Sequence, residues 1–318
     1  MKRDRYGLTR RDISALEVAK LYHERGLSQQ QVATLLHIAR PTVSKLLTHA
    51  KESGFIQVSV ADPREHDQLL TERIKQKYKL AEVRLVSVAG RGPMDLRHAL
   101  GRSAAQLLEE LVREGDVIGL SWSATIAEVV QALTPQKIAG MRVVQLRGDV
   151  PHSSKSHHIE KTYRQLAESS GASVFRLNAP AIFCSFEEKR AKAHERQVGE
   201  VLAMGASSRI AVYSVGSTDS GSVLFDSELM TEREKAQLRK SAVGDICSRY
   251  LNEKGQVCNP ELNNRTLGIS LPDLRHKEQK ILVAGGEEKL RAIHVAARYG
   301  YANRLVTDIA TAHRLLQL

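Results

Sequence analysis

The segment SQQQVATLLHIARPTVSKLLTHA, residues 28–50, predicts two short helices joined by a tight turn. Ser28 and Gln31 have the spacing of a capping box at the start of the first helix. Residues 37–40 are expected to form the turn, and Pro41 suits the first turn of a second helix, where its missing N–H is harmless. Apolar side chains recur at helical spacing in both segments. The pattern predicts a helix-turn-helix, whose second helix lies in the major groove of DNA.

The second helix presents a polar and basic face, which supplies the candidate DNA contacts. These are Arg40, Pro41, Thr42, Ser44, Lys45 and His49. An ordinary amphipathic helical hairpin is the alternative interpretation. Three features favour DNA binding: the small Ala33 at the crossing, the proline at the helix start, and a face without acidic residues before Glu52. His37 stands where glycine is usual in the turn, and histidine tolerates a positive φ better than most residues.

Length, charge and cysteine content set the broad class. The chain has 318 residues, enough for two domains, and a formal net charge of +11, which favours a polyanionic partner. The three cysteines have no metal or redox spacing, and a small odd number suits a reducing compartment. The histidine-containing run at residues 152–158 lacks supporting ligands. We therefore expect a cytoplasmic protein without metal, cofactor or membrane partner, because no signal peptide or membrane-spanning run is found.

Composition divides the chain into a small basic head and a larger C-terminal part. A helix over residues 8–25 is expected to pack behind the helix-turn-helix. Residues 55–61 alternate apolar and polar side chains, which predicts a strand that serves as a DNA-contacting wing or as a simple connection. A charged helix at residues 65–79 has an apolar edge suited to a dimer seam or to packing on the next domain. The expected domains are 1–61 for DNA binding, 62–80 as a linker helix, and 81–318 for effector binding and oligomerisation.

From residue 81 onward, short β-branched runs alternate with helical patterns. Strands are predicted at residues 82–88, 117–122, 142–146, 173–177, 210–215, 266–270, 281–284 and 304–307. Helices are predicted at residues 95–114, 124–133, 160–169, 186–204, 231–241, 287–299 and 309–316. This alternation predicts βαβ units and a mainly parallel sheet with both faces covered. Ligands of such sheets bind beyond the carboxyl ends of the strands.

The loops after these strands therefore hold the candidate effector contacts. Residues 121–125 combine hydroxyl side chains with a helix N-terminus, which suits a phosphate, although Ser123 could simply cap the helix. In the loop at residues 146–149, Arg147 could bind phosphate or form a surface salt bridge, and Asp149 could accept sugar hydroxyls. Residues 306–308 end the last predicted strand.

Three further loops complete the set: residues 215–218, which also follow an apolar strand, residues 242–247 and residues 284–289. Asp245 lies among small and apolar residues, as either a cap or a functional carboxylate. Paired glycines allow a close approach to a ligand, and Lys289 places a cation where the helix dipole disfavours it, which suggests a phosphate or sugar ligand. The full set of candidate effector contacts is Ser121, Ser123, Thr125, Arg147, Gly148, Asp149, Gly216, Asp245, Gly285, Gly286 and Lys289.

Several of these segments together resemble the SorC (SorC/DeoR) family of bacterial transcriptional regulators. The matching stretches are QQQVATLLHIARPTVSKLL, IGLSWSAT, VVQLRGD, LNAPA, IAVYSVGS, SAVGDICSRYLNEKG and ILVAGGEEKLRAIHVAARYGYANRLVTD. The resemblance implies effector contacts at Asp245, Lys289, residues 121–125 and residues 148–149. Ser123 and Asp149 depart from the family, because both replace a glycine that is common there.

The resemblance implies an α/β protein with an all-α winged helix-turn-helix head and a sugar-binding domain similar to the NagB/RpiA sugar-phosphate isomerases. It also implies a regulator, with a repressor favoured, of a sugar or nucleoside catabolic operon. The partners would be double-stranded operator DNA, a phosphorylated sugar and further copies of the chain as a homodimer or homotetramer. One alternative is a sugar-phosphate isomerase-like enzyme with Asp149 or Asp245 as base and Lys289 as electrophile. Another is an architectural DNA-binding protein.

Overall fold

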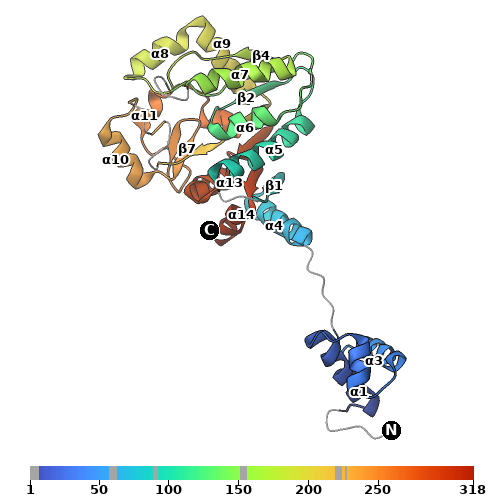
Figure 1. Ribbon diagram of the computed structural model, residues 1–318. Helices are drawn as coiled ribbons and strands as arrows, with labels where there is room; N and C mark the ends of the chain where they lie inside the picture. Colours follow the sequence, from blue (N-terminus) through green and yellow to red (C-terminus); the bar gives the residue numbers. More distant parts are fainter. Residues whose placement is uncertain (1–6, 57–62, 89–91, 151–155, 219–223, 226–227) are drawn as a thin grey trace. The chain divides into compact units, whose positions relative to one another are not determined.

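The computed structural model describes residues 7–56, 63–88, 92–150, 156–218, 224–225 and 228–318. It divides into two compact units, Met1–Pro63 and Arg64–Leu318, and each is described on its own (Figure 1). Helix α4, Pro63–Tyr78, packs its apolar edge within the second unit: Leu70 and Ile74 are buried, and the Tyr78 hydroxyl donates to the Leu315 carbonyl at 2.9 Å. Of the two roles considered for this edge, the structure therefore shows packing on the following domain.

The first unit is a cluster of short helices. They are α1 (Arg10–Ala19), the π-helical turn η1 (Lys20–Glu24), α2 (Gln29–Leu35) and α3 (Arg40–Glu52). Val18, Val32 and Val43 are fully buried between them. The turn between α2 and α3 comprises residues 36–39, one residue earlier than predicted, since Leu36 is the C-cap of α2 and Ala39 is the N-cap of α3. The predicted strand at residues 55–61 is not seen at its first two residues, and residues 57–61 lie outside the described part of the chain.

The second unit is built on a parallel sheet of seven strands. The strands are β1 (Glu82–Val86), β2 (Val117–Leu120), β3 (Arg142–Gln145), β4 (Ser173–Phe175), β5 (Ile210–Tyr213), β9 (Gln279–Val283) and β10 (Arg304–Asp308). Their order is β1-β10-β9-β5-β2-β3-β4, and each neighbouring pair is parallel. The predicted mainly parallel α/β sheet is confirmed.

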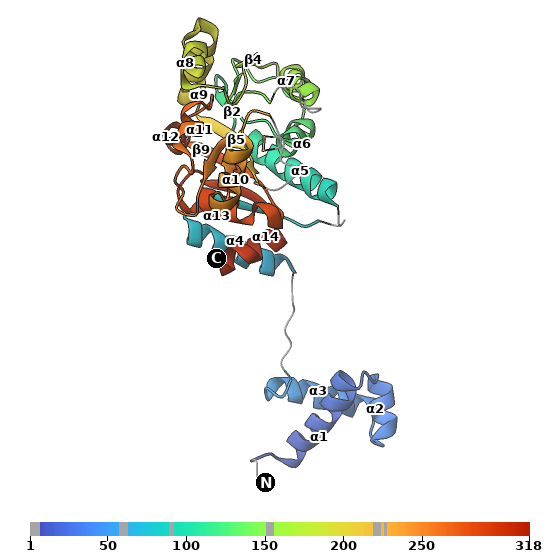
Figure 2. The ribbon, with the colours of Figure 1, turned by 90° about the vertical axis from the view of Figure 1, so that its left-hand side faces the viewer.

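Helices cover both faces of this sheet, which explains why its strands are apolar at successive positions. On β5, Ile210 and Val212 pack toward α5 (Pro93–Leu111), α6 (Ala124–Ala132) and α7 (Ser156–Ser170). Tyr213 packs on the opposite face with α4, α13 (Leu290–Arg298) and α14 (Ile309–Gln317). Helix α9 (Arg196–Ser207) covers that second face beside β3. Figure 2 shows α5, α6 and α7 to the right of the strands and α9 to the left.

The order of the strands creates a switch point between β2 and β5. From β2 the chain continues to β3 and β4 on one side, whereas β5 pairs with the other side of β2 and is followed outward by β9 and β10. In sheets of this kind, the crevice at the carboxyl ends beside such a point is the usual place for a ligand.

Two predicted elements are wrong. The strand predicted at residues 266–270 forms only isolated bridges, Ile182 to Thr266 and Arg147 to Gly268. Gly268 has φ +148° and packs against the backbone of Leu146 and Arg147, so the segment pairs with the loop that follows β3 and does not join the sheet as a strand. The single helix predicted at residues 186–204 is broken at Glu195 into α8 (Phe186–His194) and α9.

A small antiparallel sheet, which was not predicted, follows the end of β5. It consists of β6 (Val215–Gly216), β7 (Gly244–Ile246) and β8 (Arg249–Leu251). The remaining helices are α10 (Glu232–Ser241), α11 (Pro260–Asn264), α12 (Leu271–Arg275) and the 3-10 turn η2 (Glu287–Lys289). Among the helices that the structure describes, none is long and apolar enough to cross a membrane.

Candidate functional site

The exposed face of α3 carries most of the candidate DNA contacts. Ser28 and Gln31 form the predicted capping box at the start of α2. His37 has φ 54° in the turn, and Val43 on the inner side of α3 is fully buried. The outward side chains of α3 are exposed, and they include Arg40, Pro41, Thr42, Ser44 and Lys45.

His49 differs from the other candidates because it is engaged within the head. Its Nε2 lies 2.7 Å from Oδ1 of Asp12 on α1. Hydrogen bonds from Thr9, and then the contact with His49, lower the pKa of Asp12 to about 2. The structure thus gives His49 a contact that links α3 to α1, and its assignment as a DNA contact stays a prediction.

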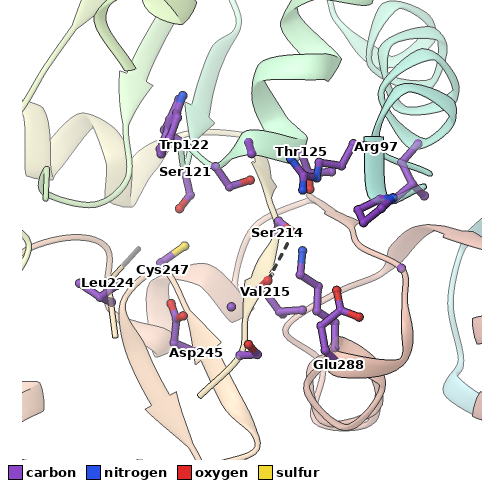
Figure 3. A pocket seen from close by; sticks show the side chains of 18 of the residues that line it. Arg97, Ser121, Trp122, Thr125, Ser214, Val215, Leu224, Asp245, Cys247 and Glu288 are labelled. Atoms are coloured by element: carbon purple, nitrogen blue, oxygen red, sulfur yellow. Dashed lines mark hydrogen bonds between the residues drawn. The ribbon is translucent and has the colours of Figure 1, made fainter. Parts of the chain in front are cut away.

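A cavity of about 400 Å³ lies at the carboxyl ends of the central strands in the second unit (Figure 3). Its walls come from the loops after β2, β3, β5 and β9, from the β6–β7–β8 sheet and from the start of α5. Eight of the predicted effector contacts line it: Ser121, Ser123, Thr125, Arg147, Gly216, Asp245, Gly285 and Lys289. Residues far apart in the sequence therefore meet in one place.

One end of the cavity is formed by the N-terminus of α6. Ser123 is the N-cap, and its side chain accepts a hydrogen bond from the Ile126 N–H at 3.2 Å. The N–H groups of Ala124 and Thr125 are the first two of the helix and have no partner within it. Ser123 thus caps the helix and also lines the cavity, so the two roles considered for it coexist. This end suits an anion, because free N–H groups and the helix dipole both favour negative charge.

Lys289 lines the cavity as the N-cap residue of α13. Its side chain is half-buried and forms no hydrogen bond or ion pair with any residue that the structure describes. Burial lowers the pKa of Lys289, which means that the surroundings do not fully compensate its charge. An anionic ligand would supply the missing compensation.

The opposite end contains a buried carboxylate. Asp245 is only 6% exposed, and one of its oxygens accepts the Ser248 N–H at 2.8 Å. Arg147 donates to the Ser248 hydroxyl at 3.0 Å and to the Trp122 carbonyl at 3.1 Å. Burial raises the pKa of Asp245, whereas Arg147, the Ser248 N–H and Lys289 oppose that rise. Such a carboxylate is well placed to accept hydrogen bonds from sugar hydroxyls.

Asp245 is held by a strained hairpin rather than by the loop that was predicted at residues 242–247. It lies on β7, and the turn to β8 consists of Cys247 (φ 49°) and Ser248 (φ 69°). Positive φ at both central residues is typical of type I′ turns. Cys247 also lines the cavity, and burial raises the pKa of its thiol to about 11, so it is a neutral group there.

Three predicted contacts lie outside the cavity lining. The Asp149 carboxylate accepts from Gln145 at 2.7 Å and from Arg176 at 3.1 Å. Gly148 packs against the backbone of Pro180, where a Cβ would come within 2.4 Å of the carbonyl oxygen. Gly286 donates its N–H to Asp308 and Thr311, which fixes the loop after β9. These three residues shape neighbouring loops, and the cavity lining does not include them.

The cavity also has walls that the sequence analysis missed. Outside the predicted loops they include Pro93, Arg97, Ser214 and Leu224. Arg97 lies on α5, well before β2, so no strand-end signal pointed to it. No group of three or more His, Cys, Asp or Glu side chains that could hold a metal is found among the described residues.

Comparisons with known proteins agree on one family. The family model for the sugar-binding domain (Sugar-bind) matches residues 62–317. The deoxyribonucleoside regulator of Bacillus subtilis (strain 168) is 39% identical over 302 residues, which cover 95% of this chain and 96% of that protein. The sorbitol operon regulator of Klebsiella pneumoniae is 27% identical over 95% of this chain and 97% of that protein.

The solved structures include that sorbitol operon regulator, SorC, at full length. It superposes with a TM-score of 0.73 and 26% identity, covering 97% of this chain and 100% of that one. A domain of a possible sugar-binding transcriptional regulator from Arthrobacter aurescens TC1 gives a TM-score of 0.73 and 27% identity over 81% of this chain and 100% of that chain. These relatives are named as regulators and not as enzymes.

Proposed function

The chain belongs to the SorC/DeoR family of transcriptional regulators with a sugar-binding domain, and from that premise we propose that a phosphorylated sugar in the cavity controls its affinity for operator DNA. Residues 1–61 would bind DNA and residues 81–318 would bind the effector and oligomerise, joined by residues 62–80. A sugar-phosphate isomerase-like activity is not favoured, since Asp149, one of its two candidate bases, is paired with Arg176.

The proposal for effector binding rests on Lys289, whose side chain has no hydrogen-bond or ion-pair partner among the described residues, in a cavity that also holds a helix N-terminus and Asp245. A phosphate would contact Lys289 and the first N–H groups of α6. The sugar hydroxyls would then reach Asp245, Arg147 and Ser121. Gly216 and Gly285 would let the effector approach the backbone closely.

The DNA half of the proposal uses the exposed face of α3. Arg40, Thr42, Ser44 and Lys45 would contact the operator, with Pro41 at the helix start. A single helix-turn-helix buries little surface on DNA, so a homodimer or homotetramer on symmetric half-sites is part of the proposal. The effector would act by shifting the population between arrangements that bind the operator and arrangements that do not. We propose a cytoplasmic repressor of a sugar or nucleoside catabolic operon.

Thermal unfolding in the presence of sugar phosphates tests the effector half. Trp122 is the sole tryptophan of the chain and lies in the second unit, so its fluorescence reports that unit alone. Ribose 5-phosphate, deoxyribose 5-phosphate, glucose 6-phosphate and fructose 6-phosphate would be compared with their parent sugars. A ligand at 100 times its Kd stabilises the native state by about 2.7 kcal/mol.

We expect one phosphate to raise Tm strongly while its parent sugar does not. Lys289→Met should abolish the shift, whereas Lys240→Met, a change of an exposed lysine on α10, should preserve it. A phosphate response that survives Lys289→Met would contradict the proposed site. A panel in which no phosphate changes Tm would contradict the proposed effector class.

A further inference from the structure

Besides Lys289 and Arg147, a third cationic side chain lines the cavity, and it comes from a helix and not from a loop at the end of a strand. Arg97 lies on α5, and Figure 3 shows it beside Thr125 at the α6 end, away from Asp245 and Cys247. Within the described residues, Arg97 forms no ion pair, and the contact of its guanidinium with the Met94 sulfur, at 3.6 Å, is a weak hydrogen bond. Its charge is therefore available to a ligand.

The crossing of α5 and α6 fixes where Arg97 can reach. The two helices approach so closely at Gly101 that a Cβ there would lie 2.7 Å from the backbone of Glu128. His98 on α5 also lies 2.6 Å from the Glu128 carboxylate. Arg97 precedes Gly101 by one helical turn on the same face, and Ala124 precedes Glu128 by one turn. Arg97 is thus held at the level of the first turn of α6.

Two sources of positive charge, Arg97 and the N-terminus of α6, lie at one end of the cavity, and Lys289 also lines it, near enough to Arg97 for that charge to lower its pKa. Burial lowers the pKa of Lys289 and the positive charge of Arg97 lowers it further, whereas the carboxylates of Glu288 and Asp245 raise it. Like charges held together in a partly buried site are unfavourable unless an anion lies between them. A phosphate monoester carries close to two negative charges at neutral pH and matches these two side chains.

The other end of the cavity has no such surplus. Arg147 lies there, but its guanidinium already donates to Ser248 and Trp122 and is near the buried Asp245. A second phosphate at this end would face the carboxylate of Asp245, whose burial leaves little screening. The distribution of charge is therefore asymmetric along the cavity.

We propose that Arg97 and Lys289 together bind a single phosphate at the N-terminus of α6, so that the effector is a sugar monophosphate with its sugar toward Asp245. The inference rests on the proposed function and narrows it in two ways. It assigns Arg97 as a specificity-determining phosphate ligand, and it disfavours bisphosphorylated sugars.

Calorimetric titration of the full-length chain tests this assignment. The probes are inorganic phosphate, the four sugar monophosphates named above, their parent sugars and fructose 1,6-bisphosphate. Arg97→Gln should lower the affinity for inorganic phosphate and for the tightest-binding monophosphate by about tenfold or more, as expected for loss of a charge-assisted hydrogen bond. Arg102→Gln, a change of an exposed arginine on the same helix, should leave both affinities within about twofold of the wild type.

Two further measurements separate loss of phosphate binding from loss of folding if Arg97→Gln perturbs folding. Arg97→Lys retains the charge and should bind monophosphate more tightly than Arg97→Met, and Trp122 emission reports whether each variant keeps a native second unit. Full phosphate affinity in Arg97→Gln, with loss in Lys289→Met, would overturn the assignment of Arg97 and leave the proposed function standing. Binding of fructose 1,6-bisphosphate more tightly than every monophosphate would overturn the single-phosphate inference. Binding of no phosphate by the wild type would overturn both proposals.

Discussion

Gly216 leaves room for the Asp245 carboxylate, because a Cβ at residue 216 would lie 2.0 Å from Oδ1 of Asp245. We predict that Gly216→Ala displaces this carboxylate and weakens binding of the most stabilising sugar phosphate by about tenfold or more, through loss of charge-assisted hydrogen bonds. The Tm shift of the second unit measures the loss.

The matched control for this change is Gly205→Ala on α9. There a Cβ would lie 3.5 Å from Leu146, which is an ordinary contact. The alanine should stabilise α9 by up to about 1 kcal/mol, and ligand binding should be unchanged. Equal effector responses of Gly216→Ala and wild type would show that Asp245 does not contact the ligand.

Asp116 directly precedes β2, at the amino-terminal ends of the parallel strands, and its carboxyl group makes the free energy of unfolding depend on pH. It is 8% exposed and receives two hydrogen bonds from Arg209, at 2.7 and 2.5 Å. Those bonds are the largest influence and lower the pKa of Asp116. At pH 7, Asp116→Asn should reduce the free energy of unfolding by about 3 kcal/mol, since one partner of a largely buried pair is removed.

The sign of the pH effect follows from the direction of this shift. A carboxyl group whose pKa is lower in the native state stabilises the fold above its unfolded pKa of about 3.9, and this contribution is lost as pH falls through the native pKa. The difference between wild type and Asp116→Asn should therefore be full at pH 7 and shrink below about pH 4. Urea unfolding followed by Trp122 fluorescence measures it, and Glu200→Gln, which breaks an exposed pair with Arg196, should change stability little at either pH. A difference that stays constant down to pH 3 would contradict this account.

At the scale of elements, the recognition helix carries a prediction about DNA. Replacing Arg40 and Lys45 together by alanine should weaken operator binding, because each side chain neutralises a phosphate of the DNA backbone. The slope of log affinity against log salt should fall by about one for each phosphate that the variant no longer neutralises. A fragment selected by the full-length protein would serve as the operator in a binding assay at several salt concentrations. Arg25→Ala changes an exposed arginine outside α3 and should have less effect. An unchanged operator affinity in the double variant would exclude α3 as the recognition helix.

Elements with strong periodicity were predictable from the sequence, and elements defined by long-range contacts were not. The run DVIGL predicts β2 because buried parallel strands are apolar at successive positions. In contrast, β7 and β8 have three residues each and depend on a turn of Cys247 and Ser248, which carries none of the usual turn residues. Residues 266–270 have a strand-like composition but form only isolated bridges, to Arg147 and Ile182, outside the named strands.

The same limit applies to the candidate site. Strand-end reasoning predicted Asp245 and Lys289, and both line the cavity. It also selected Asp149, whose side chain pairs with Arg176 instead, because a strand end alone does not tell on which side of the sheet a loop turns. Arg97 was missed because its position depends on the crossing of α5 with α6 at Gly101, which no local pattern encodes.

At the scale of the whole molecule, coupling between effector and operator must be reciprocal. If the sugar phosphate changes operator affinity by some factor, saturating operator DNA must change effector affinity by the same factor, typically about 5–150-fold. Titration of the most stabilising sugar phosphate with and without operator DNA measures one factor, and operator titration with and without effector measures the other. Two unequal factors would show that the states being compared differ in assembly as well as in ligation.

The cavity walls begin at Pro93 and are completed only at Lys289, whereas α3 ends at Glu52. During synthesis, the ribosome therefore completes α3 early, and it adds the last residues that line the cavity near the end of the chain. A chain terminated before Gly285 would keep the recognition helix but lack the Lys289 side of the cavity. Under the proposed function, responsiveness to a metabolite would be the last property that the growing polypeptide acquires, and premature stop codons would remove it before they remove the head.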